Sequence, residues 1–83
     1  MLFAIDIGNT NVHVGIFREK EEIHSFLLGT DPRRTSDEYA LLLKSLTEFA
    51  GYTAADFDGA ILGSVVPSVT DTIAAAAKKL LGF

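Results

Sequence analysis

Residues 2–16 read LFAIDIGNTNVHVGI, and this stretch decides the fold. Residues 2–7 are apolar on both faces except at Asp6, a pattern typical of a central strand that is covered on both sides. Gly8 and Asn9 tolerate positive φ and therefore predict a turn. Apolar and polar residues then alternate with the two-residue period of a second strand. The stretch predicts an antiparallel hairpin with a carboxylate beside its turn.

A third strand and a helix follow the hairpin. After a charged turn, residues 23–28 predict a third strand, so the first three strands form an antiparallel meander. Thr35 and Glu38 have the spacing of a capping box, and apolar residues then recur at helical intervals. Gly51 is expected to end this helix in the usual C′ position.

The last part of the chain predicts a fourth strand, residues 57–64, and a second helix. Pro67 suits the first turn of that helix, and Ser68 with Asp71 is an alternative cap. The element order is βββαβα, and a right-handed crossover makes strand four parallel to strand one. We therefore expect an α/β fold with a mixed sheet in the order 3-2-1-4, in which one edge of strand four is open.

Composition restricts the class of protein. The 83 residues allow one domain at most, and the apolar fraction of 48% is that of a folded chain. The formal net charge of −4 disfavours direct nucleic-acid binding. The absence of cysteine excludes disulfides and thiolate metal sites. No apolar run approaches the roughly 20 residues of a membrane span, and no targeting segment is visible, so we expect a cytoplasmic protein without membrane contact.

The predicted sheet brings the ends of strands one and four to one edge, where ligands bind in open α/β sheets. The backbone N–H groups of residues 8–11 could converge there on an anion such as phosphate, with the Thr10 hydroxyl as a further donor. A carboxylate beside phosphate is repulsive unless a cation lies between them, so Asp6 is interpreted as a Mg²⁺ ligand, through water. Alternatively, Asp6 caps the turn by accepting backbone N–H bonds.

Other polar residues have mainly structural interpretations. His13 is expected to be packed or solvated. Arg33 and Arg34 are expected to be solvated charges, with Asp37 and Glu38 as candidate partners; alternatively, they reach a phosphate or another subunit. Ser64 is expected mainly to link strand to helix, and Lys78 and Lys79 to be solvated near a helix end. The chain contains neither a P-loop nor a dinucleotide-binding fingerprint, and no zinc-protease motif.

Three segments together resemble type III pantothenate kinases. The first is DIGNTN, residues 6–11, with Gly15 and Phe17 after it. The second is RTSDEY, residues 34–39, and the third is GSVVP, residues 63–67. They occur in the family's order and span most of the chain.

The resemblance implies a ribonuclease H-like half-domain of the actin-like ATPase type. It implies ATP-dependent phosphorylation of pantothenate to 4′-phosphopantothenate, the first step of coenzyme A biosynthesis, in a homodimer that uses Mg²⁺ and a monovalent cation, K⁺ or NH₄⁺. The residues that it places along the ATP phosphates are Asp6, Ile7, Gly8, Asn9, Thr10, Asn11, Val12 and His13.

The chain departs from the family in length. Family members carry a second domain and a general base, an aspartate in a later Gly-x-Asp-Arg motif, which nothing here matches. We therefore expect residues 1–83 to be the N-terminal part of the first actin-like ATPase domain, inactive alone and prone to self-association through its open strand. Two alternatives stay open: another kinase or ATPase of the same superfamily, and a non-enzymatic transcriptional accessory or interaction protein.

Overall fold

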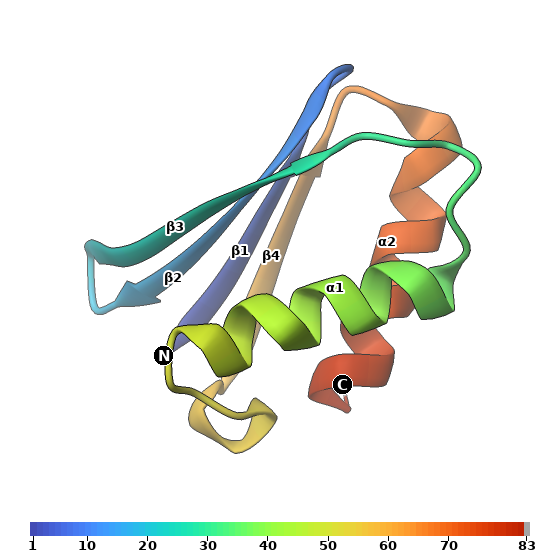
Figure 1. The fold of residues 1–83 in the computed structure, drawn as a ribbon. Helices are drawn as coiled ribbons and strands as arrows, with labels where there is room; N and C mark the ends of the chain where they lie inside the picture. Colours follow the sequence, from blue (N-terminus) through green and yellow to red (C-terminus); the bar gives the residue numbers. More distant parts are fainter. Residues whose placement is uncertain (83) are drawn as a thin grey trace.

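A computed structural model of the chain describes residues 1–82. The expected element order is confirmed, with one short 3₁₀ helix, η1, that the sequence analysis did not predict (Figure 1). The elements are β1 (Leu2–Ile7), β2 (Asn11–Arg18), β3 (Glu21–Gly29), α1 (Ser36–Phe49), η1 (Ala54–Asp56), β4 (Gly59–Ser64) and α2 (Pro67–Leu81). Phe83 lies outside the described residues. Within residues 1–82, neither helix is long and apolar enough to cross a membrane.

The sheet has the predicted order β3-β2-β1-β4. β1 pairs antiparallel with β2 and parallel with β4, as the crossover rule requires. In this register Asp6 lies between His13 on β2 and Gly63 on β4. The fold is thus a mixed α/β sheet consistent with half of an actin-like ATPase domain.

Both helices pack on the same face of the sheet (Figure 1). Alternate residues of the two central strands point to this face and are buried against Tyr39 and Leu43 of α1 and Val69 and Ile73 of α2. The buried strand residues are Phe3, Ile5, Ile7, Val12, Val14 and Ile16. The expectation that β1 is covered on both sides is therefore wrong for the described residues. Its second face carries Leu2, Ala4 and Asp6, and the first two made the strand look apolar throughout.

The β1–β2 turn differs from the expectation in its backbone. Neither Gly8 nor Asn9 has a positive φ, although the sequence suggested that property. A Cβ on Gly8 would instead lie 3.1 Å from the carbonyl oxygen of Asn11, which is tighter than an ordinary contact. A side chain at Gly8 would therefore need the neighbouring backbone to shift by a few tenths of an ångström. Within residues 1–82, the non-glycine residue with positive φ is Glu19 in the next turn, at 58°.

The ends of α1 follow the sequence signals. Thr35 is the N-cap and forms the full capping box with Glu38, whose backbone N–H donates to Thr35 Oγ1 at 3.2 Å. Gly51, with φ of 92°, follows the C-cap residue Ala50, as expected for a C′ glycine.

The start of α2 corrects the alternative cap. Val66 is the N-cap, without a side-chain cap bond, and Pro67 occupies the first turn. Ser68 is already inside the helix, so the cap from Ser68 and Asp71 is wrong. Proline at the first helical position has φ suited to the helix and no N–H to satisfy, so the helix begins before that cap.

The two helices are joined by an ion pair that the sequence analysis missed. Lys79, near the end of α2, donates to Ser36 Oγ at 3.0 Å and pairs with the Asp37 carboxylate, both in the first turn of α1. The Lys79 side chain is still half exposed, so it is solvated as expected but also has a partner. Because both charged side chains are exposed, this pair adds little to the stability of the fold.

Candidate functional site

The β1–β2 loop and the β4–α2 connection lie at the same end of the sheet (Figure 1). The backbone N–H of Val65, just after β4, donates to the carbonyl of Ile7 at 3.1 Å. Because β1 and β4 are parallel, their carboxyl ends meet at this edge, as predicted. Asp6 and the loop of residues 8–11 are therefore next to residues 64–66.

Asp6 is exposed at this edge and has no hydrogen-bond or ion-pair partner within residues 1–82. The absence of a side chain at Gly63 leaves space beside it, since a Cβ there would lie 3.7 Å from Asp6 Oδ1. The alternative in which Asp6 caps the turn is not observed, because the Gly8 N–H donates to the Asn11 carbonyl at 2.8 Å. Asp6 thus presents an unpaired carboxylate to solvent.

The loop of residues 8–11 is exposed between two buried residues. Asn9, Thr10 and Asn11 are exposed, whereas Ile7 and Val12 are 0% exposed in the core. Over residues 1–82, the backbone N–H groups of Asn9 and Thr10 have no hydrogen-bond partner. Donors available to an anion are therefore the N–H groups of Asn9 and Thr10 together with the polar side chains, while the Gly8 N–H is already used.

Thr30 contacts this loop and was missed by the sequence analysis. Its hydroxyl donates to the Gly8 carbonyl at 2.8 Å, and its backbone N–H donates to the Thr10 carbonyl at 2.9 Å. The strand topology predicted from the sequence could have located Thr30. In a three-strand meander the third strand runs parallel to the first, so a polar residue after the third strand lies at the edge where the first strand ends.

His13 lies on the open face of the sheet and makes ordinary polar contacts. Its Nε2 is 2.8 Å from Ser25 Oγ and 3.6 Å from a carboxylate oxygen of Glu22. Together with Asp6, Gly15 and Gly63 it lines a shallow hollow of about 310 Å³. These contacts agree with the expectation that His13 is packed or solvated.

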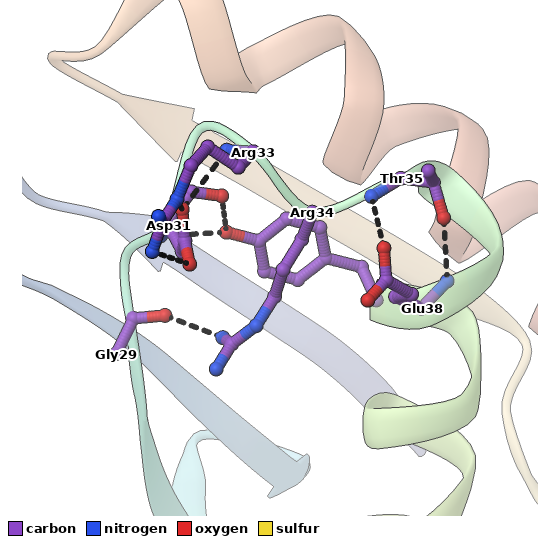
Figure 2. Close-up of polar contacts among 7 residues, drawn as sticks. Gly29, Asp31, Arg33, Arg34, Thr35 and Glu38 are labelled. Carbon is purple, nitrogen blue, oxygen red and sulfur yellow. Dashed lines mark hydrogen bonds and ion pairs between the residues drawn. The ribbon is translucent and has the colours of Figure 1, made fainter.

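The segment between β3 and α1 runs from Gly29 to Thr35 at the start of α1 (Figure 2). Arg33 pairs with Asp31, with Nε 3.2 Å from Oδ1, and Arg34 donates to the Gly29 carbonyl at 2.8 Å (Figure 2). The Arg34 guanidinium also lies 5.6 Å from the centre of the Tyr39 ring. The exposed Arg33 agrees with the expectation of a solvated charge. Neither arginine pairs with the candidate partners, because Asp37 binds Lys79 and Glu38 closes the capping box.

Hydrogen bonds from the Arg33 side chain and backbone N–H lower the pKa of Asp31 below its usual 3.8. A carboxyl whose pKa is lowered by folding stabilises the fold above its unfolded pKa and loses that contribution as pH falls through the folded pKa. We expect the difference in unfolding free energy between wild type and Asp31→Asn to be constant above about pH 5 and to shrink below 3.8. Urea unfolding at a series of pH values measures this difference. A difference that grows as the pH falls would contradict the prediction.

Ser64 makes a local turn at the end of β4. Its hydroxyl accepts from the Val66 N–H at 3.0 Å and lies 3.3 Å from the Val66 carbonyl, to which it donates. This agrees with a mainly structural role in linking β4 to α2.

A larger hollow, of about 630 Å³, lies between α1, η1 and the end of α2. Its lining includes Leu41, Lys44, Tyr52 and Leu80. None of the residues expected to contact phosphate lines it. The candidate site is therefore the exposed edge at Asp6 and residues 8–11, and size alone would have pointed to the wrong face.

Comparison with known proteins bears on this edge. The sequence model of a family described as type III pantothenate kinase matches residues 2–83. The chain belongs to this family. Relatives named type III pantothenate kinase include proteins from Finegoldia magna, 48% identical over all 83 residues, and Moorella thermoacetica, 39% identical over 82 residues or 99% of the chain. Another, from Halalkalibacterium halodurans, is 37% identical over 79 residues, or 95% of the chain.

The chain spans about a third of the length of these type III pantothenate kinases. The matched residues are 32% of the Finegoldia magna and Moorella thermoacetica proteins and 31% of that from Halalkalibacterium halodurans. The match to the family includes all three segments that suggested it, among them the DIGNTN stretch at the candidate site.

Proposed function

We propose that the loop of residues 8–11 binds the phosphates of ATP in a kinase that phosphorylates pantothenate to 4′-phosphopantothenate. The observation that carries the proposal is the combination, at one sheet edge, of the unpaired Asp6 carboxylate and the unpaired N–H groups of Asn9 and Thr10. Successive backbone N–H groups without internal partners can form a concave anion site. Membership of the type III pantothenate kinase family supports ATP as the anion and pantothenate as the acceptor.

The side chains at this edge fit a hydrated Mg²⁺ better than a metal held by protein ligands alone. Within residues 1–82 no group of three or more His, Cys, Asp or Glu residues could hold a metal. Asp6 supplies one exposed carboxylate with space beside Gly63, and Mg²⁺ characteristically keeps several waters and uses one or two carboxylates. Bound there, Mg²⁺ would neutralise charge on the phosphates. Asp6 would hold it through water.

Each of residues 7–13 has its own proposed role in this site. Asn9, Thr10 and Asn11 would contact the phosphates with backbone and side-chain donors, whereas Gly8 would allow the close turn. Ile7 and Val12, buried on the core face, would fix both ends of the loop. His13 would border the site from the open face. In phosphoryl transfer such positioning and charge neutralisation supply most of the catalysis.

Residues 1–83 would be the N-terminal part of the first actin-like ATPase domain. The general base, the pantothenate contacts and the site for K⁺ or NH₄⁺ would come from later parts of the protein, which would work as a cytoplasmic homodimer. We expect the full-length protein to release ADP in a pantothenate-dependent reaction and the 83-residue chain to release none. ADP release with another acceptor but not with pantothenate would overturn the proposed substrate. Activity of the 83-residue chain would overturn the expectation that the general base and the pantothenate contacts come from later parts of the protein.

The outer edge of β4 predicts self-association of the 83-residue chain. In the described residues β4 pairs with β1 alone, and Ile61 on this strand is 57% exposed. Unpaired strands with exposed apolar residues pair readily with other chains. We expect sedimentation to show dimers or larger species at high concentration, and Ile61→Lys to reduce them. A strictly monomeric wild-type chain would contradict this prediction.

A further inference from the structure

The loop of residues 8–11 is held from outside by a residue of another strand. Within the loop, the Gly8 N–H donates to the Asn11 carbonyl at 2.8 Å. The Gly8 and Thr10 carbonyls instead accept from Thr30, one from its hydroxyl at 2.8 Å and one from its backbone N–H at 2.9 Å. Thr30 thus binds the turn at two places.

These bonds determine where the donors of the loop point. A trans peptide group is planar, and its N–H points opposite to its C=O. When the Gly8 carbonyl is directed at the Thr30 hydroxyl, the Asn9 N–H must point away from Thr30. That N–H is one of the two loop donors without a partner in the part of the chain that the structure describes. Thr30 therefore orients a group that is available to a ligand.

Thr30 is itself fixed on both sides. The next residue, Asp31, donates its N–H to the Tyr39 hydroxyl at 3.0 Å and accepts from that hydroxyl at 2.9 Å. Tyr39 is only 1% exposed in α1, so this contact is anchored in the core. On the other side, Arg34 donates to the carbonyl of Gly29 at 2.8 Å (Figure 2). The loop is thereby connected to the first turn of α1 through Thr30.

We infer that Thr30 is a positioning residue for phosphate binding: its hydroxyl holds the Gly8–Asn9 peptide in the orientation that a phosphate needs. The inference rests on the proposed function of this loop, because it concerns the same ATP phosphates. Thr30 does not contact the ligand in this account. It acts through Gly8, and its effect belongs to nucleotide affinity and not to acceptor binding.

The test compares Thr30→Val, which removes the hydroxyl at nearly constant shape, with Thr30→Ser, which keeps it. Both variants keep the backbone bond to Thr10. In the full-length protein we expect Thr30→Val to weaken Mg-ATP binding and raise the KM for ATP by about tenfold, because it leaves the Gly8 carbonyl unpaired and the peptide free to turn. The KM for pantothenate should not change, and Thr30→Ser should restore ATP affinity.

A second readout requires no ligand. Amide hydrogen exchange at Gly8, whose N–H is bonded to the Asn11 carbonyl, should become faster in Thr30→Val but not in Thr30→Ser. Thr47→Val is the matched control. It removes a threonine hydroxyl that donates to the Leu43 carbonyl at 2.7 Å, buried within α1. This control should leave both Gly8 exchange and ATP affinity unchanged even if it lowers stability.

The outcomes separate the inference from the function on which it rests. Wild-type protein that binds no Mg-ATP would overturn the proposed function, and the role of Thr30 in phosphate binding with it. If wild type binds and Thr30→Val binds equally well, only the inference on Thr30 is overturned. It is also overturned if Thr30→Ser or Thr47→Val loses as much ATP affinity as Thr30→Val, because the loss would then not follow the hydroxyl on the loop.

Discussion

Replacing Asp6 by Asn is expected to reduce kcat/KM for ATP in the full-length protein by about 10²- to 10³-fold, the usual cost of losing one electrostatic group at a phosphoryl or acyl site. Asn has nearly the same shape as Asp but no charge, so it cannot hold hydrated Mg²⁺ against the phosphates. The Mg²⁺ concentration for half-maximal activity should rise at the same time. Coupled ADP-release assays at several Mg²⁺ concentrations measure both effects.

The fold should survive this substitution, so a loss of activity can be attributed to the site and not to unfolding. Asp6 is exposed and unpaired within residues 1–82, so the unfolding midpoint of Asp6→Asn should equal that of wild type. Asp71→Asn is the matched control, since Asp71 is also exposed and has no ion-pair partner in the described residues. Near wild-type activity in Asp6→Asn would contradict the prediction and remove the charge of Asp6 from the mechanism.

The topology could be predicted because several local signals agreed. The two-residue period of β2, the capping box at Thr35 and the proline at the start of α2 each predict one element, and the handedness of the crossover then determines the strand order. The position of Asp6 at the sheet edge follows from that order. It required only that β1 and β4 be parallel, and the register places Asp6 opposite Gly63.

The misses arise where the outcome depends on tertiary contacts. Leu2 and Ala4 are apolar, and composition cannot show that the described helices cover only the opposite face. Gly8 suggested positive φ, but the reason for glycine is the Asn11 carbonyl 3.1 Å from where a Cβ would be. Thr30 resembles any polar loop residue until the meander brings it to the β1–β2 turn. Arg33 had several acidic neighbours in sequence, and the choice of Asp31 depends on the path of the loop.

Phe3→Ala is expected to have the largest effect on stability. Phe3 is 0% exposed in the central strand, and its ring meets that of Phe57 edge to face at 5.2 Å. Removing a buried phenylalanine ring costs about 3–5 kcal/mol, because apolar contacts are lost and a cavity remains. A domain of this size has a total stability at the low end of about 5–15 kcal/mol. The substituted 83-residue chain should therefore keep only about 0–2 kcal/mol of stability at 25 °C and unfold at a much lower urea concentration than wild type, as measured by circular dichroism and urea titration.

Phe49→Ala is the control for this prediction, because Phe49 is 85% exposed at the end of α1 and should cost no more than about 0.5 kcal/mol. The pair of variants also tests the register of β1. A slip of one residue would exchange the two faces of the strand, exposing Phe3 and burying Asp6. If Phe3→Ala cost no more than Phe49→Ala, Phe3 would not lie in the core. The placement of Asp6 on the open face, on which the phosphate site depends, would then be wrong as well.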